Sequence, residues 1–330
     1  MTSSSTFPYT RLRRTRMNVW SRELVAESKL LPADLILPVF IEDGKNTSTP
    51  IPSLPDVNRV TTNLLVKAAR DAYACGIKAI ALFPKIAGEL KSPYGDQAFF
   101  DDNLVCRAIK ELKNAVPDIG VIADVALDPY TTHGQDGIMV NGRIDNDATI
   151  EALCKQALNM ARAGCDVLAP SDMMDGRIGA IREVLEEEGF IDTIILSYSA
   201  KYASSMYAPF RDAVGSGVNL GKSDKRTYQM DYANSDEAMR EIEMDIAEGA
   251  DIVMVKPAIA YLDIIQRASS SFNIPVFAYQ VSGEYAMIKA AAANGWIDGE
   301  PVMLEQLTSI KRAGAKAIFT YAALDVAIKL

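Results

Sequence analysis

The sequence is poor in the side chains that build soft-metal centres. It has one histidine, His133, and four cysteines among 330 residues. A single histidine excludes a multi-histidine metal cage and a histidine relay. The cysteines stand apart without CxxC spacing, which favours reduced thiols in a cytosolic setting over a disulfide framework. They are Cys75, Cys106, Cys154 and Cys165. Nor does any apolar run reach the roughly 18 residues that a membrane-spanning helix needs.

Positive charge is also in deficit, with 34 Lys and Arg against 43 Asp and Glu and a net charge of −9. This balance argues against nucleic acid and anionic membrane as partners, because both attract basic surfaces. The exception is the N-terminus, which is rich in Ser, Thr and Arg and has no acid before Glu23.

The basic N-terminus overlaps in composition with organelle transit peptides, but it lacks the apolar segment of a secretion signal. We favour an exposed arm over residues 1–30, with a helix around 18–28, that needs another subunit to hold it. The chain is accordingly expected to be cytoplasmic and of bacterial type, with a plastid location as the weaker alternative.

Eight apolar, β-rich runs alternate with segments that have the i, i+3, i+4 spacing of helices, several of which end at glycine. This order predicts an α/β protein with a single (β/α)8 TIM barrel over residues 31–330. An open doubly wound sheet is the alternative, weakened because neither GxGxxG nor a Walker loop is present. The predicted strands are 35–40, 77–84, 121–127, 165–170, 191–199, 250–256, 274–283 and 315–323.

Two consecutive strands end on a lysine, Lys201 in SYSAKY and Lys256 in MVKPA. In a parallel sheet both side chains emerge at the same edge. An ammonium in an apolar pocket beside another cation loses proton affinity, and a neutral lysine amine attacks carbonyl carbon to form a Schiff base. The alternative is that both are solvated lysines at strand ends. This would be the better explanation for one such lysine, but it is a poor one for two in matching positions.

Other polar residues follow the predicted strands, and two long connections lie beside them. The connection 129–148 is acidic and glycine-rich, and 202–236 is predicted to be a lid without regular structure of its own. This lid carries Arg211, Lys222, Lys225 and Arg226. A basic lid over a lysine pair suggests a small substrate with a carboxylate or phosphate. If the lid is considered by itself, a solvated charged loop is an equally good explanation.

Five motifs of the sequence resemble those of the porphobilinogen synthase (5-aminolevulinate dehydratase) family: SYSAKY, PFRDA, MVKPAIAYLDII, YQVSGEYAM and APSDMMDGR. The resemblance covers essentially the whole chain. It implies a lyase that condenses two molecules of 5-aminolevulinate asymmetrically into porphobilinogen, with loss of two waters, in tetrapyrrole synthesis. It further implies a TIM barrel with an extended N-terminal arm and a homo-octamer.

The resemblance also implies roles for particular residues. Lys256 is expected to form the Schiff base with the substrate that becomes the propionate side, and Lys201 the one with the other substrate. Residues expected to contact substrate are Arg211, Lys225, Gln229, Ser282, Tyr321, Tyr279, Ser171 and Asp124.

Zinc-type members carry three cysteines after the third strand, where this chain has Ala126, Asp128 and Asp136. Without thiolates no zinc is expected. Asp124, Asp128 and Asp136 suit Mg²⁺ or a monovalent cation, or acid/base work without metal. MREIEMDIAEGAD resembles the family's allosteric magnesium motif, with Glu241 as ligand. One carboxylate is enough for Mg²⁺, which keeps most of its waters. Without the resemblance, Glu241 would be interpreted as an ordinary charged residue on the exposed face of a helix.

Two other functions remain open on the residues alone. A class I aldolase would use one essential lysine and a phosphate-binding turn after the last two strands, and IFTYAALDV has no Gly-rich turn there. A non-catalytic barrel leaves the lysine pair unexplained.

Overall fold

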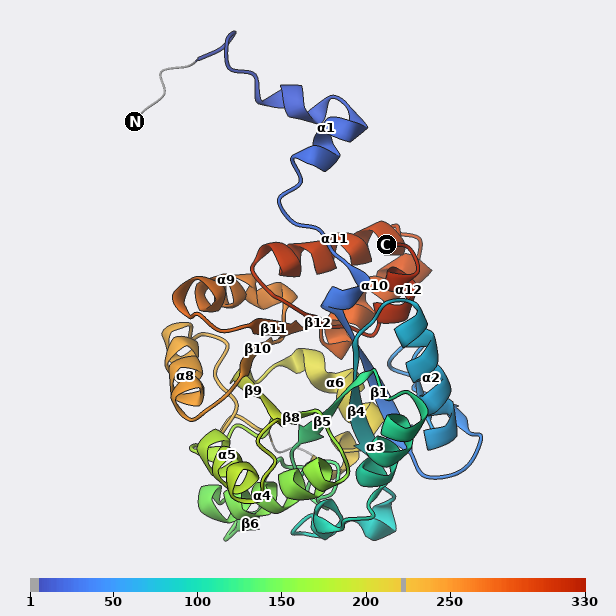
Figure 1. The fold of residues 1–330 in the computed structure, drawn as a ribbon, viewed down its shortest axis with the longest axis vertical. Helices are drawn as coiled ribbons and strands as arrows, with labels where there is room; N and C mark the ends of the chain where they lie inside the picture. The colour runs from blue at the N-terminus through green and yellow to red at the C-terminus, as the bar shows by residue number, and fades with distance from the viewer. Residues whose placement is uncertain (1–5, 221–223) are drawn as a thin grey trace.

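The computed structural model describes residues 6–220 and 224–330, and in them eight parallel strands close into a barrel (Figure 1). The closing pair joins the last strand to the first, with Leu35 opposite Ile318 and Ile36 opposite Phe319. This pairing excludes the open sheet. The strands are β1 (Leu35–Glu42), β4 (Ala79–Lys85), β5 (Gly120–Val125), β8 (Val167–Pro170), β9 (Ile194–Lys201), β10 (Ile252–Lys256), β11 (Val276–Tyr279) and β12 (Ile318–Phe319).

All eight predicted strands are confirmed, with ends that move by a few residues. The last two are much shorter than predicted, because only a few residues of each pair with a neighbour. Beside the barrel, β3 (Asn58–Val60) extends the edge of β1 and pairs with β2 (Ser48–Pro50), while β6 (Met139–Val140) and β7 (Arg143–Ile144) form a hairpin within the connection 129–148.

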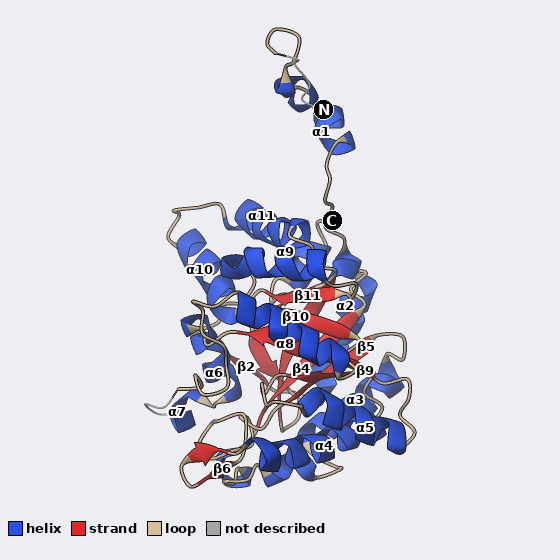
Figure 2. Ribbon diagram, turned by 90° about the vertical axis from the view of Figure 1, so that its left-hand side faces the viewer, coloured by secondary structure: helices blue, strands red, loops and turns tan. Residues whose placement is uncertain are grey.

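Helices surround the strands in both ribbon views (Figures 1 and 2). Each buries an apolar stripe against the sheet, as Leu65, Val66 and Ala69 of α2 do. The helices that follow the strands are α2 (Thr62–Ala74), α3 (Leu104–Ala115), α4 (Asn146–Arg162), α5 (Arg177–Glu187), α8 (Asp236–Ala247), α9 (Leu262–Ser271), α10 (Ser282–Ala293), α11 (Gly299–Arg312) and α12 (Ala323–Ala327).

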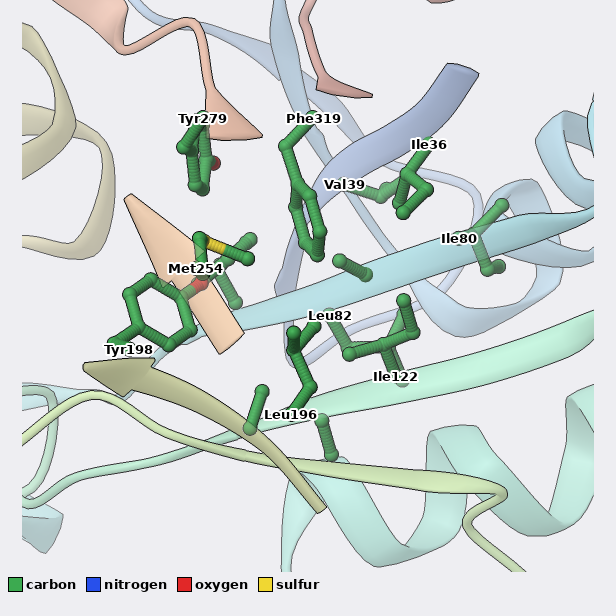
Figure 3. Close-up of a cluster of buried hydrophobic side chains, with 14 of the residues drawn as sticks. Ile36, Val39, Ile80, Leu82, Ile122, Leu196, Tyr198, Met254, Tyr279 and Phe319 are labelled. Carbon is green, nitrogen blue, oxygen red and sulfur yellow. The ribbon is translucent and has the colours of Figure 1, made fainter. Parts of the chain in front are cut away.

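Apolar side chains fill the inside of the barrel, so that it is a packed core and not a pore (Figure 3). Ile80 and Leu82 of β4 are fully buried there. Towards the carboxyl ends of the strands the core becomes aromatic, with Tyr198 of β9 and Tyr279 of β11. The rings of these two tyrosines lie beside Lys256 in the site described below.

The segment 202–236 differs from the prediction, because part of it is helical: η5 (Ser205–Tyr207), α6 (Ala208–Val214) and α7 (Gly217–Leu220). Tyr207, Phe210 and Val214 have helical spacing and turn to the core, which stabilises α6. The segment lies close to the start of α10, where a Cβ on Gly283 would come within 2.5 Å of the Met206 carbonyl. Only glycine permits this approach.

The N-terminal segment leads away from the barrel in both views and contains η1 (Leu12–Arg16) and α1 (Val19–Leu24). The helix is shorter than the predicted 18–28. Its large apolar side chains are exposed, with Trp20 at 64% and Leu24 at 77%. None of the helices in the described part of the chain combines the length and hydropathy that a membrane crossing requires.

Candidate active site

Lys201 and Lys256 lie side by side at the carboxyl ends of β9 and β10, whose register places them directly opposite each other. The two residues are 6% and 5% exposed. Both line one cavity at the mouth of the barrel, where the sequence predicted them.

Aromatic rings surround the amine of Lys256. The distances from its Nζ to the ring centroids are 4.6 Å for Tyr279, 5.0 Å for Tyr198, 5.0 Å for Phe210 and 5.3 Å for Tyr207. Within the described residues this amine has no hydrogen-bond partner. Burial first, and the charge of Lys201 second, lower the pKa of Lys256 to about 7.

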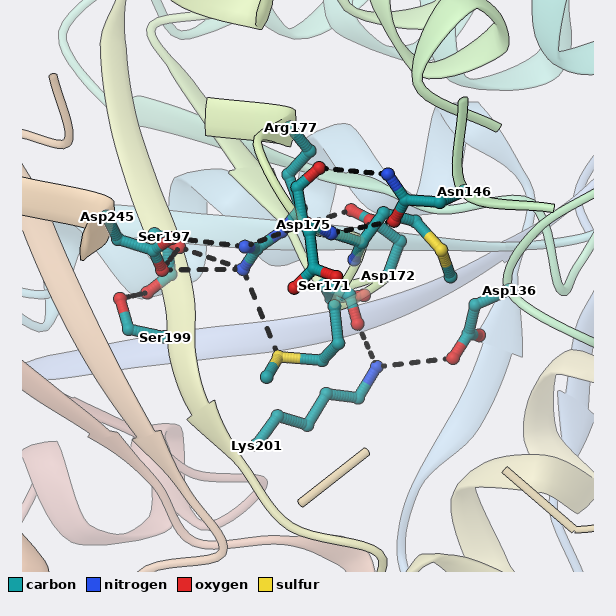
Figure 4. Close-up of polar contacts among 12 residues, drawn as sticks. Asp136, Asn146, Ser171, Asp172, Asp175, Arg177, Ser197, Ser199, Lys201 and Asp245 are labelled. Atoms are coloured by element: carbon teal, nitrogen blue, oxygen red, sulfur yellow. Dashed lines mark hydrogen bonds and ion pairs between the residues drawn. The ribbon is translucent and has the colours of Figure 1, made fainter. Parts of the chain in front are cut away.

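Lys201 has polar surroundings instead. Its ammonium donates a hydrogen bond to the Ser171 carbonyl and lies 3.6 Å from Oδ2 of Asp136, as the dashed lines in Figure 4 indicate. The two amines therefore differ in environment although they are adjacent. One has an apolar surround that favours the neutral nucleophile, and the other is held by an acceptor and a carboxylate.

Asp124, at the end of β5, is the carboxyl group of the site whose properties best suit general acid/base catalysis. Burial raises its pKa to about 7, against the attraction of Lys201 and Lys256. One of its oxygens, Oδ1, has no hydrogen-bond partner in the described residues. A carboxyl group with this pKa is present in both protonation states near neutral pH, as a general acid/base requires.

Asp128 and Asp136 share the ammonium of Lys225, which lies 3.3 Å from Asp128 Oδ2 and 2.7 Å from Asp136 Oδ1. Burial raises the pKa of Asp128. For Asp136 burial is outweighed by Lys201 and Lys225, which hold its pKa below the usual value. Lysines thus lie beside both carboxylates, although Asp136 Oδ2 has no hydrogen-bond partner among the described residues. No group of three or more His, Cys, Asp or Glu side chains suited to a metal ion occurs in residues 6–220 and 224–330.

The structure brings most of the predicted site residues together. The cavity is small, about 30 Å³, and holds a few waters at most. Lys222 lies outside the described residues. The residues that line the cavity are Asp124, Asp128, Asp136, Ser171, Lys201, Tyr207, Phe210, Arg211, Lys225, Gln229 and Lys256.

Three predicted substrate contacts lie just behind this lining. The hydroxyl groups of Tyr279 and Tyr321 are hydrogen-bonded to each other at 3.0 Å. Ser282 Oγ accepts a hydrogen bond from the Phe210 N–H at 3.0 Å and donates one to the Met206 carbonyl at 3.3 Å. Ser282 therefore holds the lid backbone in this conformation.

Glu241 does not belong to the lysine cavity. It is half-buried on α8 and lines a neighbouring surface cavity together with Asp175 and Glu237. Burial raises its pKa, the charge of Arg177 opposes this, and Asp245, Asp175 and Glu237 raise it further.

Three of the rings around Lys256, those of Tyr198, Tyr207 and Phe210, were not predicted from the sequence. Two signals were available. Tyr198 lies in the same strand as Lys201, and Tyr207 and Phe210 have i, i+3 spacing within a segment predicted to be irregular. Recognising that spacing as helical would have directed both rings to the core.

Replacing Phe210 with alanine is expected to move the acid side of the pH–activity profile to higher pH. Water then reaches the Lys256 ammonium, and its pKa rises from about 7 towards its ordinary value. The active, neutral amine is consequently lost at a pH where the unmodified chain still has it. The measurement is kcat/KM against pH, with Phe100→Ala as the control because Phe100 is 53% exposed. Identical acid limbs in all three proteins would contradict this explanation of the pKa.

Comparison with known proteins identifies relatives across almost the whole chain. The family model described as delta-aminolevulinic acid dehydratase matches residues 9–329. A delta-aminolevulinic acid dehydratase of Bradyrhizobium diazoefficiens is 52% identical over 97% of this chain and 90% of its own length. A chloroplastic delta-aminolevulinic acid dehydratase of Glycine max is 49% identical over 96% of this chain and 77% of its own length.

A solved structure is equally similar. It is the delta-aminolevulinic acid dehydratase (porphobilinogen synthase) of Toxoplasma gondii in complex with the reaction product porphobilinogen. It superposes with a TM-score of 0.95 at 50% identity and covers 97% of this chain and 91% of that chain. The similarity thus extends over the whole barrel and its mouth.

Proposed function

The chain belongs to the delta-aminolevulinic acid dehydratase family, and we propose that Lys256 and Lys201 are the two amines with which it condenses two molecules of 5-aminolevulinate. Its activity is that of the family, a lyase reaction that forms porphobilinogen in tetrapyrrole synthesis. The observation that carries the assignment is the buried Lys256 amine, with a pKa lowered to about 7, beside a second lysine.

In the proposed mechanism each lysine attacks the keto carbon of one substrate as the neutral amine, so the Lys201 ammonium first gives up a proton. Each keto oxygen leaves as water when its imine forms, which accounts for the two waters lost. The imine withdraws electrons from the neighbouring carbon, so that a proton leaves it and a carbanion equivalent attacks the second imine carbon. The carbon attacks one imine carbon and a substrate amine attacks the other. In each adduct the bond from that carbon to the lysine nitrogen then breaks, the lysine leaves as the amine, and loss of protons from the new ring gives the aromatic pyrrole. The chain ends the cycle unchanged.

Asp124 is proposed to transfer protons between these steps, since its pKa of about 7 lies near that of Lys256. Ser171 contributes its carbonyl, which orients the amine of Lys201. The steps are assigned to the chain's own residues, and Lys225 and Lys201 balance the charge of Asp128 and Asp136.

The substrate carboxylates are proposed to bind at two polar groups of residues. Ser282 and Tyr321, with Tyr279, would bind the substrate held by Lys256. Arg211, Lys225 and Gln229 would bind the other from the lid. Two substrates need more room than the cavity of about 30 Å³ offers, so the proposal requires the described lid residues, 202–220 and 224–236, to move when the substrates enter.

The reaction is tested by incubating the purified chain with 5-aminolevulinate and assaying for the pyrrole product. We expect porphobilinogen at half the molar amount of substrate consumed. A chain that forms no pyrrole after chelation, and none with added Mg²⁺, K⁺ or Zn²⁺, would overturn the proposed function.

The family generally uses metal ions, and for this chain we propose Mg²⁺ at Glu241 and no Zn²⁺. The charges fit this ion, because Glu241 lies among Asp175 and Glu237 and a dication relieves their repulsion. Mg²⁺ retains several waters and needs one or two carboxylates, so the single half-buried carboxylate is sufficient. The ion would act by electrostatics at α8, away from the reacting atoms.

Replacing Glu241 with alanine is expected to bring the ratio of rates with and without Mg²⁺ down to about one, because the carboxylate that holds the ion is gone. The measurement is turnover of chelator-treated protein across a Mg²⁺ titration. Glu243→Ala is the matched control, on the same helix and exposed. If Glu241→Ala is stimulated as strongly as this control, Glu241 is not the ligand.

The N-terminal arm, residues 1–30, is proposed to pack on another copy of the chain in a homo-octamer. Its exposed Trp20 and Leu24 would otherwise face water, and its arginines suit the acidic surface of a chain with net charge −9. We propose a cytoplasmic location, which the free, unpaired cysteines favour.

A further inference from the structure

A buried guanidinium lies one layer behind the cavity, outside the residues to which the mechanism assigns a role. Arg177 is the first residue of α5, and its side chain is 2% exposed. Figure 4 shows it between Asp245 and Ser197 on one side and the loop that contains Ser171 and Asp172 on the other. A buried arginine needs partners for its charge and its five N–H groups. Its partners therefore show what it holds in place.

One set of partners fixes Arg177 to α8 and β9. Its Nη1 donates to Asp245 Oδ1 at 3.1 Å, and its Nη2 donates to Ser197 Oγ at 3.1 Å. Ser197 in turn donates to Asp245 Oδ2 at 2.6 Å. Ser197 precedes Lys201 by four residues in the same strand. The guanidinium is thus tied to the strand that carries a Schiff-base lysine.

The other set fixes the loop after β8. Arg177 Nε lies 3.6 Å from Asp172 Oδ2, and Nη1 donates to the Met174 carbonyl at 3.4 Å. Asp172 Oδ1 accepts the Met174 N–H at 2.8 Å. Between them Met173 has a φ of +69°, a left-handed conformation that costs a methionine about 1 kcal/mol or more. The loop keeps this conformation because the contacts around it leave no alternative.

This loop determines where the Lys201 amine lies. The residue before Asp172 is Ser171, whose carbonyl accepts the hydrogen bond of the Lys201 ammonium. The Ser171 N–H is itself fixed, by the Val125 carbonyl at 3.1 Å. Arg177 therefore contacts both the strand from which Lys201 extends and the loop that carries its acceptor.

Charge adds to this arrangement. Burial raises the pKa of Asp172 to about 6, and Arg177 is the strongest opposing influence, with Lys201 also favouring the ionised form. Arg177 thus keeps a carboxylate ionised close to Lys201. Buried ion pairs of this kind add little stability over apolar packing, so fixed geometry is the better explanation of what the pair contributes.

We propose that Arg177 is a positioning residue for Lys201: it locks the Ser171–Met174 loop to β9 so that the Lys201 amine points at the keto carbon of its substrate. This inference rests on the proposed function, since it presupposes that Lys201 forms an imine. A merely structural role would lower stability and affect the two lysines alike. A positioning role affects Lys201 selectively.

The test is site-resolved trapping of the imines. Protein is incubated with 5-aminolevulinate, reduced with borohydride, and the modified fractions of Lys201 and Lys256 are measured by mass spectrometry. Arg177→Lys keeps a charge but loses the fork of donors. We expect the Lys201:Lys256 ratio and kcat to fall at least about tenfold, because a displacement of about 1 Å at a reacting group has effects of this order.

Arg182→Lys is the matched control. It lies on the same helix and pairs with Asp251 at 2.6 Å, but it bonds to Gly249 and Thr193 at the other end of the strands. Its ratio should equal that of the unmodified chain. If Arg177→Lys also keeps that ratio and only melts earlier, the positioning role is wrong.

Asp172→Asn covers the case in which Arg177→Lys does not fold. Asparagine keeps the shape and the contact to Met174 but removes the charge that faces Arg177. In this variant the modified fraction of Lys201 is expected to fall while that of Lys256 stays unchanged. A Lys201 fraction equal to that of the unmodified chain would overturn the inference. The unmodified chain separates the two levels. If neither lysine, or Lys256 alone, is modified in it, the proposed function with two imines fails. If both are modified and the variants keep its Lys201:Lys256 ratio, only the positioning role of Arg177 fails.

Discussion

Lys256→Met is expected to lower kcat by at least about 10,000-fold, the order of loss found when a covalent nucleophile is removed. Methionine retains the length and apolar stem of the lysine, so it continues to pack among the rings of Tyr279, Tyr198 and Phe210. It forms no imine, and the neighbouring Lys201 is held by Ser171 and cannot take its place.

The fold should survive this substitution. Exchange of a buried amine for an apolar side chain of similar volume is neutral or stabilising, so the melting temperature should not fall. Lys113→Met is the control, because Lys113 pairs with Asp166, at the opposite end of the strands from the lysine pair, at 2.9 Å. A folded Lys256→Met protein with activity close to that of this control would refute the role assigned to Lys256.

Lys201→Met is expected to lower kcat by at least about 1,000-fold, because one of the two substrates then lacks its covalent attachment. Lys256 should still form an imine with 5-aminolevulinate, detectable by borohydride reduction and mass spectrometry. The variant thus separates capture of the first substrate from condensation with the second. A variant that forms porphobilinogen at an unchanged rate would show that Lys201 takes no covalent part.

The same variant tests how the two amines interact. The charge of Lys201 is the second cause, after burial, of the lowered Lys256 pKa. Without it the pKa of Lys256 should rise, so that imine formation at Lys256 requires a higher pH. The loss of the neighbouring positive charge leaves Asp124 and Asp136 to favour the ammonium, which shifts the pKa in the same direction. An unchanged pH dependence would mean that burial, without the charge of Lys201, lowers the pKa of Lys256.

Much of the barrel and of its catalytic pair could be predicted from the sequence, because both depend on local patterns. Apolar β-rich runs at regular spacing define the strands, and parallel strands present their carboxyl ends at one edge. Lys201 and Lys256 end adjacent strands in the sequence, and their register follows from that order. The absence of cysteines near Asp128 and Asp136, from which no zinc is expected, can likewise be read from one short segment of the sequence.

The environment of each amine could not be predicted, since it depends on contacts between distant segments. Phe210 reaches Lys256 from a segment that was predicted to be irregular, and the salt bridges of Lys225 span 97 residues to Asp128. Arg177 has the same character, because its partner Asp245 lies 68 residues away. Periodicity indicates that such residues are buried but not what they contact.

The most direct test of the central claim is the pH dependence of imine formation at Lys256 itself. Protein is mixed with 4-oxopentanoate from about pH 5 to about pH 9, a range that brackets neutral pH. The imine is reduced at short times, and the modified fraction of Lys256 is measured by mass spectrometry. Our account predicts a rate that rises with a midpoint near the pKa of about 7. A rate that keeps rising towards the ordinary lysine value of about 10.4 would contradict the claim that burial and Lys201 keep this amine uncharged.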